Sequence, residues 1–134
     1  MASTLALAAT INTPLNGCKA YVLDWLAHTD QTVNNSITDL TGLLAGRIIA
    51  VETIPGLNGD LTTTLPTNLY DAYIKDAYAT DVMAGAIINR SGTVGERVNP
   101  TVPIPIWGAL TLVIAAAGDS KTGRLIIVVD ETRP

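Results

Sequence analysis

The sequence predicts an all-β fold, a β-sandwich or barrel-like single domain of about seven antiparallel strands that follows an extended N-terminal arm. Three observations lead to this prediction. The chain has 134 residues, which is the size of one domain. Short segments rich in β-branched residues recur along it, and clusters of glycine, proline, asparagine and aspartate separate them. Such regular spacing of strands and turns is typical of sandwiches and barrels.

The first segment, residues 1–18, is rich in threonine, alanine and leucine and shows no periodicity. We expect an extended arm here and a β domain over residues 19–134. Such an arm would become ordered only on the surface of a partner, where it could add as a strand to an exposed sheet edge. The apolar residues that would make this contact are Leu5, Leu7, Ile11, Pro14 and Leu15.

Alternation of side chains marks the strands of the domain. In the segment KAYVLDWLAH, residues 19–28, Tyr21, Leu23 and Trp25 fall on one side. The segments GALTLVIAAAG and GRLIIVVDE also alternate, and the turn at residues 118–123 between them predicts a hairpin. These patterns predict strands over residues 19–28, 36–40, 45–54, 110–115 and 124–129.

The segment TNLYDAYIKDAYATDVMAGAIINR, residues 67–90, fits two structures. Its apolar residues recur at helical spacing, and they also alternate as in a strand. Two strands here would complete the seven, whereas a helix would give an α+β protein. The segment also holds three aspartates, Asp71, Asp76 and Asp81, which could form a general acid–base pair, bind calcium, or shape a turn. We expect the turn, because a spacing of five residues does not match a calcium-binding loop.

Composition excludes several classes of function. The net charge is −4 and the pI is near 4.6, so we expect no nucleic-acid partner. No membrane span is expected either, because the longest apolar run, residues 102–118, is too short and contains Pro103 and Pro105. Only 15% of the residues are charged and the mean hydropathy is +0.34, which indicates that the chain buries surface against other chains.

Few residues could support catalysis or bind a cofactor. The chain has one cysteine, Cys18, and one histidine, His28, so neither a cysteine zinc site nor a disulfide within the chain can form. We expect no enzyme activity, no metal and no cofactor. Trp25 and Trp107 lie in apolar segments, where we expect them to pack in the core rather than to form a platform for sugars.

Residues 46–129 contain a series of short motifs. A strand that ends in Pro-Gly, GRIIAVETIPG, precedes a glycine- and threonine-rich loop with Pro-Thr, NGDLTTTLPTN. The motifs that follow are Tyr70-Asp71 with Asp76; Asp81-Val82, Gly85-Ala86 and Asn89-Arg90; Pro105, Gly108 and Leu110-Thr111-Leu112; and Thr122-Gly123 with Val129.

With these motifs the chain resembles small virion structural proteins of tailed bacteriophages, which are often encoded beside the major capsid protein. The resemblance implies an all-β fold in which residues 70–75 and 82–88 are consecutive strands. It differs at one point, because the segment DAYATD at residues 76–81 replaces the acidic Asp-Glu-Asp-Gly turn that is common in the group.

The resemblance also implies a function and a location. It suggests a capsid decoration (cement) protein that binds the outer surface of an HK97-type shell and stabilises it, made in the bacterial host cytoplasm and carried in the virion. The expected partners are the major capsid protein and further copies of this chain, with a homotrimer as the first expectation and a dimer as the second. The alternatives are a phage tail, neck or fibre-anchoring protein, and a receptor- or sugar-binding β-sandwich module.

Overall fold

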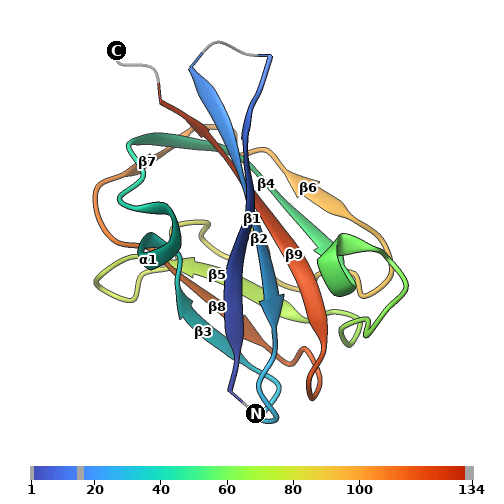
Figure 1. Cartoon of the computed structure of the whole chain (residues 1–134). Coiled ribbons are helices and arrows are strands. Elements are labelled where there is room, and N and C mark those ends of the chain that lie inside the picture. Colours follow the sequence, from blue (N-terminus) through green and yellow to red (C-terminus); the bar gives the residue numbers. More distant parts are fainter. Residues whose placement is uncertain (1, 15–16, 132–134) are drawn as a thin grey trace.

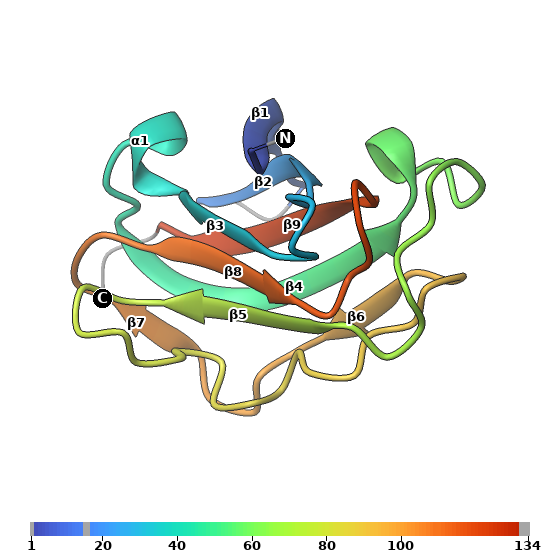
Figure 2. The ribbon, with the colours of Figure 1, turned by 90° about the horizontal axis from the view of Figure 1, so that it is seen from below.

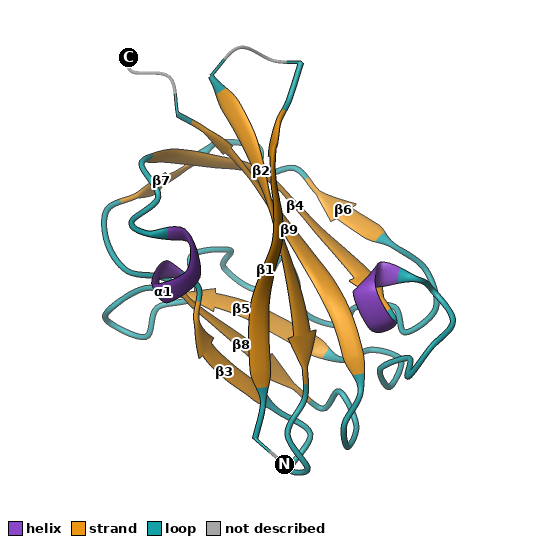
Figure 3. Ribbon diagram, viewed as in Figure 1, coloured by secondary structure: helices purple, strands orange, loops and turns teal. Residues whose placement is uncertain are grey.

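The structure, a computed structural model, describes residues 2–14 and 17–131 and confirms the all-β fold (Figures 1 and 3). Within these residues a short helix α1, Thr38–Thr41, and a 3-10 turn η1, Leu57–Gly59, accompany nine strands. The strands are β1 Thr4–Asn12, β2 Cys18–Leu26, β3 Val33–Ser36, β4 Gly46–Pro55, β5 Asp71–Lys75, β6 Glu96–Val98, β7 Ile104–Ile106, β8 Thr111–Ala115 and β9 Thr122–Asp130.

The strands form two antiparallel sheets that lie in two layers (Figure 2). The larger sheet has six strands in the order β1-β2-β9-β4-β6, and β7 pairs with β4 at a different point from β6. The smaller sheet has the order β3-β8-β5. The architecture is therefore a β-sandwich with sheets of unequal size, and β1 lies at one edge of the larger sheet.

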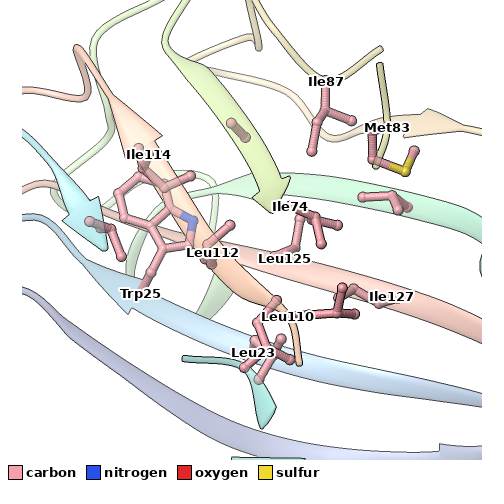
Figure 4. Packing of buried hydrophobic residues seen from close by; sticks show 14 of the residues in the cluster. Leu23, Trp25, Ile74, Met83, Ile87, Leu110, Leu112, Ile114, Leu125 and Ile127 are labelled. Atoms are coloured by element: carbon pink, nitrogen blue, oxygen red, sulfur yellow. The ribbon is translucent and has the colours of Figure 1, made fainter. Parts of the chain in front are cut away.

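The core lies between the two sheets, as the side chains in Figure 4 show. The alternation in β2 places Leu23 and Trp25 in this core, and the Trp25 ring lies 5.6 Å from the ring of Tyr70 at a tilted angle. Both sheets contribute apolar side chains that are almost completely buried. They include Val33, Ile48, Val51, Ala72, Ile74, Leu112, Ile114, Leu125, Ile127 and Val129.

The expected hairpin of residues 110–115 and 124–129 is wrong, because β8 and β9 belong to different sheets. The loop between them bonds to other parts of the chain: the Ala117 N–H donates to the carbonyl of Gln31, and the Lys121 carbonyl accepts from Ala27 N–H. The two alternating segments therefore face each other across the core, with Leu112 and Leu125 both fully buried. Inward-facing residues of a hairpin and of two facing strands have the same period, so the pattern could not separate them.

The strand expected over residues 36–40 is also misplaced. The strand β3 ends at Ser36, whose hydroxyl accepts a hydrogen bond from the Asp39 N–H at 3.1 Å and so stabilises the turn α1. Hydroxyl side chains that bond nearby backbone N–H groups favour a helical start over strand pairing.

Residues 4–12, expected as part of a free arm, form the edge strand β1 and pair with β2. Leu5 lies opposite Trp25 and Leu7 lies opposite Leu23, and both leucines pack partly buried against the core. The period-two spacing of these two leucines was the signal of a strand, which the surrounding alanines and threonines obscured. The chain gains main-chain hydrogen bonds from its own sheet here, so the segment needs no partner to be ordered.

Gly123 is required by the packing of Trp25, its cross-strand neighbour in β2. A Cβ atom at position 123 would lie 2.6 Å from Cε2 and 2.9 Å from Nε1 of the indole. The Trp25 ring thus lies directly over the glycine, and a glycine in a strand marks such a close approach.

We predict that Gly123→Ala lowers the free energy of unfolding by about 1–3 kcal/mol, because the indole must move in a filled core. Urea denaturation monitored by tryptophan fluorescence and circular dichroism measures this. Gly108→Ala is the matched control, since a Cβ there meets nothing within 4 Å. Equal stabilities of the two variants would contradict the packing argument.

Two tyrosines, Tyr70 and Tyr21, lower the free energy of unfolding at alkaline pH. Burial raises the pKa of Tyr70 from 10.0 to about 12. Burial, followed by a hydrogen bond to Glu131, raises the pKa of Tyr21 to about 12. The folded state therefore holds these protons above pH 10, where the unfolded chain releases them.

We expect the free energy of unfolding contributed by these tyrosines to be constant below about pH 10 and to be lost between about pH 10 and 12. Chemical denaturation across this range measures the loss. Tyr70→Phe should show a smaller fall than the native chain, because phenylalanine has no proton to release. The same pH dependence in both proteins would disprove the role of Tyr70.

Candidate functional site

The turn at residues 76–81 is built by the side chain of Asp76. Its Oδ1 atom accepts hydrogen bonds from the N–H groups of Tyr78, at 2.9 Å, and Thr80, at 3.0 Å. Ala79 adopts a left-handed conformation with φ of 61° within this turn. The expectation that Asp76 shapes a turn is confirmed.

The other two aspartates hold different parts of the backbone. Asp81 accepts from Met83 N–H through Oδ1, at 3.1 Å, and from Gly85 N–H through Oδ2, at 2.8 Å. Asp71 accepts from Asn89 N–H at 3.0 Å. The three carboxylates thus act as acceptors for three separate segments. Among residues 2–14 and 17–131, no group of three or more acidic, histidine or cysteine side chains is placed to hold a metal ion.

The second strand implied for residues 82–88 is wrong, because this segment is a series of turns. Ala84 and Gly85 have positive φ angles of 52° and 81°, which a strand does not allow. The segment still covers the edge of β5, since Ile87 carbonyl accepts from Ala72 N–H and Val82 N–H donates to Ile74. Asp81 and Asp71 accept hydrogen bonds from backbone N–H groups of this segment, which favours turns over pairing as a strand. Met83 and Ile87 are nevertheless buried, as the apolar pattern predicts.

A hollow of about 200 Å³ lies between this turn region and β7, and we call it the Trp107 hollow. Apolar side chains of β7, with Ile48 of the adjoining β4 and Leu110, line one side of it. Asp76, Thr80 and Asp81 line the other side. Of the described residues that line it, none is basic.

Trp107 lies at the rim of this hollow with 76% of its surface exposed, so the expectation that it packs in the core is wrong. It follows β7 in a loop between Ile106 and Gly108, and Leu110 takes the buried position instead, at 3% exposure. Tyr78, in the turn that forms the opposite wall, is 85% exposed. Apolar neighbours in sequence gave no sign that the tryptophan would face outwards.

The residues predicted to contact a partner are not brought together in one place. Leu5 and Leu7 face the core, whereas Ile11 is 50% exposed and Pro14 is exposed. Ile11 and Pro14 line a groove of about 480 Å³ on the outer face of the larger sheet, with Ala50, Ile126 and Val128. Leu15 lies outside the described residues.

Cys18 and His28, the lone cysteine and histidine of the chain, lie in a buried strand and an exposed turn, respectively. Cys18 is buried at the start of β2, and burial raises the pKa of its thiol, with the Asp130 carboxylate adding to the shift. A raised pKa disfavours the reactive thiolate. The Nδ1 atom of His28 accepts a hydrogen bond from Asp30 N–H at 3.0 Å within an exposed turn. No helix in the described part of the chain is long and apolar enough to cross a membrane.

We predict that Asp81→Ala lowers the free energy of unfolding by about 1–2 kcal/mol, because two backbone donors lose their acceptor. Asp81→Asn should lose less, since its one side-chain oxygen can still accept. Thermal or urea unfolding of the three proteins measures the difference. If Asp81→Ala is as stable as the native chain, these hydrogen bonds do not hold the wall of the Trp107 hollow.

Comparison of the chain with protein-family models, with curated proteins and with solved structures finds no match. The resemblance to phage virion proteins therefore rests on the order and chemistry of the short motifs between residues 46 and 129.

Proposed function

We propose that this chain is a virion structural protein, a capsid decoration protein that binds the outer surface of an HK97-type phage shell and stabilises it. The observation that supports this proposal best is Trp107, an aromatic side chain 76% exposed beside an apolar hollow. The major capsid protein is the proposed partner. The role is one of binding, without catalysis, metal or cofactor.

Exposed tryptophans beside hollows are suited to protein interfaces. Tryptophan, tyrosine and arginine carry much of the binding energy in interfaces, and they cluster where water is excluded. A side chain of the shell that enters the Trp107 hollow would contact the indole at the rim and the apolar wall that contains Leu110 and Ile48. Removing about 100 Å² of apolar surface from water contributes about 2–3 kcal/mol.

The hollow is also held rigidly, which limits the entropy lost on binding. Its apolar wall belongs to β7, which pairs with β4 through Ile48 and Ile104. Its opposite wall is fixed by the hydrogen bonds that Asp76 and Asp81 accept from the backbone. A preformed site on a sandwich suits a protein that must fit a regular lattice.

A second candidate is a receptor- or sugar-binding module, which the exposed aromatic residues Trp107 and Tyr78 favour. Trp107 and Tyr78 expose broad aromatic surface that could stack on a pyranose ring. A tail, neck or fibre-anchoring role would use the same surface for a different virion partner. Cryo-electron microscopy of intact particles would separate these roles, because a decoration protein covers the shell in hundreds of copies.

We predict that Trp107→Ala weakens binding to undecorated capsids at least about tenfold, which corresponds to about 1.4 kcal/mol. Co-sedimentation with capsids at a series of protein concentrations measures the affinity. Leu43→Ala is the matched control, because Leu43 is 71% exposed but does not line the hollow.

The outcomes separate the two candidates. Capsid binding that is unchanged in Trp107→Ala would disprove the proposed shell contact. If the native chain does not bind capsids but binds a glycan array, and Trp107→Ala loses that binding, the sugar-binding module replaces the decoration protein.

A further inference from the structure

Among the described residues, β1 is the longest strand edge with no strand paired to its outer side, although β3 and α1 lie near it. It has nine residues and pairs with β2 on one side, and no strand lies on its other side. The outer edge of β5 is covered by the turns of residues 81–90. The strands β6 and β7 have three residues each, and β3 has four and leads into α1.

The β1 edge also lacks the features that usually prevent pairing. Proteins protect exposed edges with charged side chains, especially lysine, and with proline. The sequence of β1, TLALAATIN, has neither, and the first charged residue of the chain is Lys19. By contrast, the edge strand β7 carries Pro105. A row of free main-chain donors and acceptors is thus open to another strand.

The strand is held in place before any partner arrives. Leu5 and Leu7 pack against the core, and the Ser3 hydroxyl donates to the Asn35 side chain of β3 at 2.7 Å. Figure 2 shows β1 at the rim of the larger sheet, above β3. An ordered edge loses little conformational entropy when a further strand is added.

We propose that two copies of this chain pair through their β1 strands, antiparallel and about a two-fold axis, so that two six-stranded sheets become one of twelve strands. A second copy fits because the chain has a net charge of −4 but none of it lies on β1, so the two edges meet without repulsion. An isologous contact of this kind uses both open edges and closes at two subunits.

The bulge in β1 restricts how the strands can align. The register shifts between Leu7 and Ala9, so Ala6, Ala9 and Ile11 share the outer face of the sheet. Side chains on one face of a sheet must lie opposite side chains on the same face. With two-fold symmetry and pairing along the whole strand on both sides of the bulge, this places Ala6 opposite either Ala9 or Ile11 of the other copy. In both registers the two bulges lie next to the axis, so the paired strands bend together.

A pair of charge variants tests the contact with a matched control. We expect Ala6→Lys with Ala9→Lys to be monomeric, because lysines of the two copies then crowd one edge, whereas Ala6→Lys with Ala9→Glu should remain dimeric. The variants differ only at residue 9, which is exposed, and both place a lysine opposite Asp24 of the same chain. Analytical ultracentrifugation at concentrations from about 1 to 500 μM gives the mass relative to the 14.0 kDa chain.

Every outcome bears on the proposal. The proposal is supported if the native chain has twice the mass of one chain, the first variant has the mass of one chain, and the second variant again has twice that mass. Circular dichroism should be the same for all three proteins. A native monomer at the highest concentration, a trimer, or equal dimerisation of the two variants would overturn it. The result is independent of capsid binding, so the decoration role and the β1 contact stand or fall separately.

Cysteine cross-linking tests the alignment directly. Opposite residues in antiparallel strands have Cα atoms about 4.5–5.5 Å apart, which suits a disulfide. A mixture of Ala6→Cys chains with Ala9→Cys or Ile11→Cys chains should form a disulfide-linked dimer under mild oxidation, in one of the two mixtures. The native chain, with its buried Cys18, is the control. Failure of both mixtures while the native chain is dimeric would overturn the β1 contact.

Discussion

The packing of the Trp25 indole is the contact on which most of the structure depends. It lies over Gly123 of the neighbouring strand and against Tyr70, which immediately precedes β5 of the smaller sheet. The ring therefore joins the two layers and sets where β5 begins. Tyr70 also bridges to Arg90 through the backbone, and this ends the turns that start at Asp81. The wall of the Trp107 hollow is thus positioned by the core.

The hydrogen-bond partners of backbone groups at the strand edges explain where the surface is covered and where it is open. Residues 81–90 bond to β5 at intervals and cover it without forming a ladder, because Asp81 and Asp71 accept from turn backbone groups. The outer side of β1, at the rim of the larger sheet, has no strand paired to it, and Trp107 is exposed beside the covering turns. Two surfaces suited to association follow from one requirement, the pairing of backbone polar groups.

These surfaces support the proposal that the protein assembles with partners. The Trp107 hollow offers an aromatic anchor for a different partner, and β1 offers main-chain pairing that is self-complementary. The aspartates that first suggested acid–base chemistry instead accept hydrogen bonds from the backbone. A shell protein with one contact to the capsid and another to its own copy would reinforce a lattice at two points, which is the role proposed here.

The pattern of residues was enough to predict the strands β2 and β4 and the role of Asp76 in a turn, because period-two alternation and local side-chain bonding are encoded in neighbouring residues. It left residues 67–90 open between a helix and strands, and the strand at residues 70–75 was implied by the resemblance to phage proteins. Other features depended on contacts between distant residues. The separation of β8 from β9, the turns at residues 82–88 and the pairing of β1 were decided by which backbone groups found partners across the sandwich. The exposure of Trp107 was likewise decided by tertiary packing, since Leu110 fills the buried position that the sequence pattern offered to both.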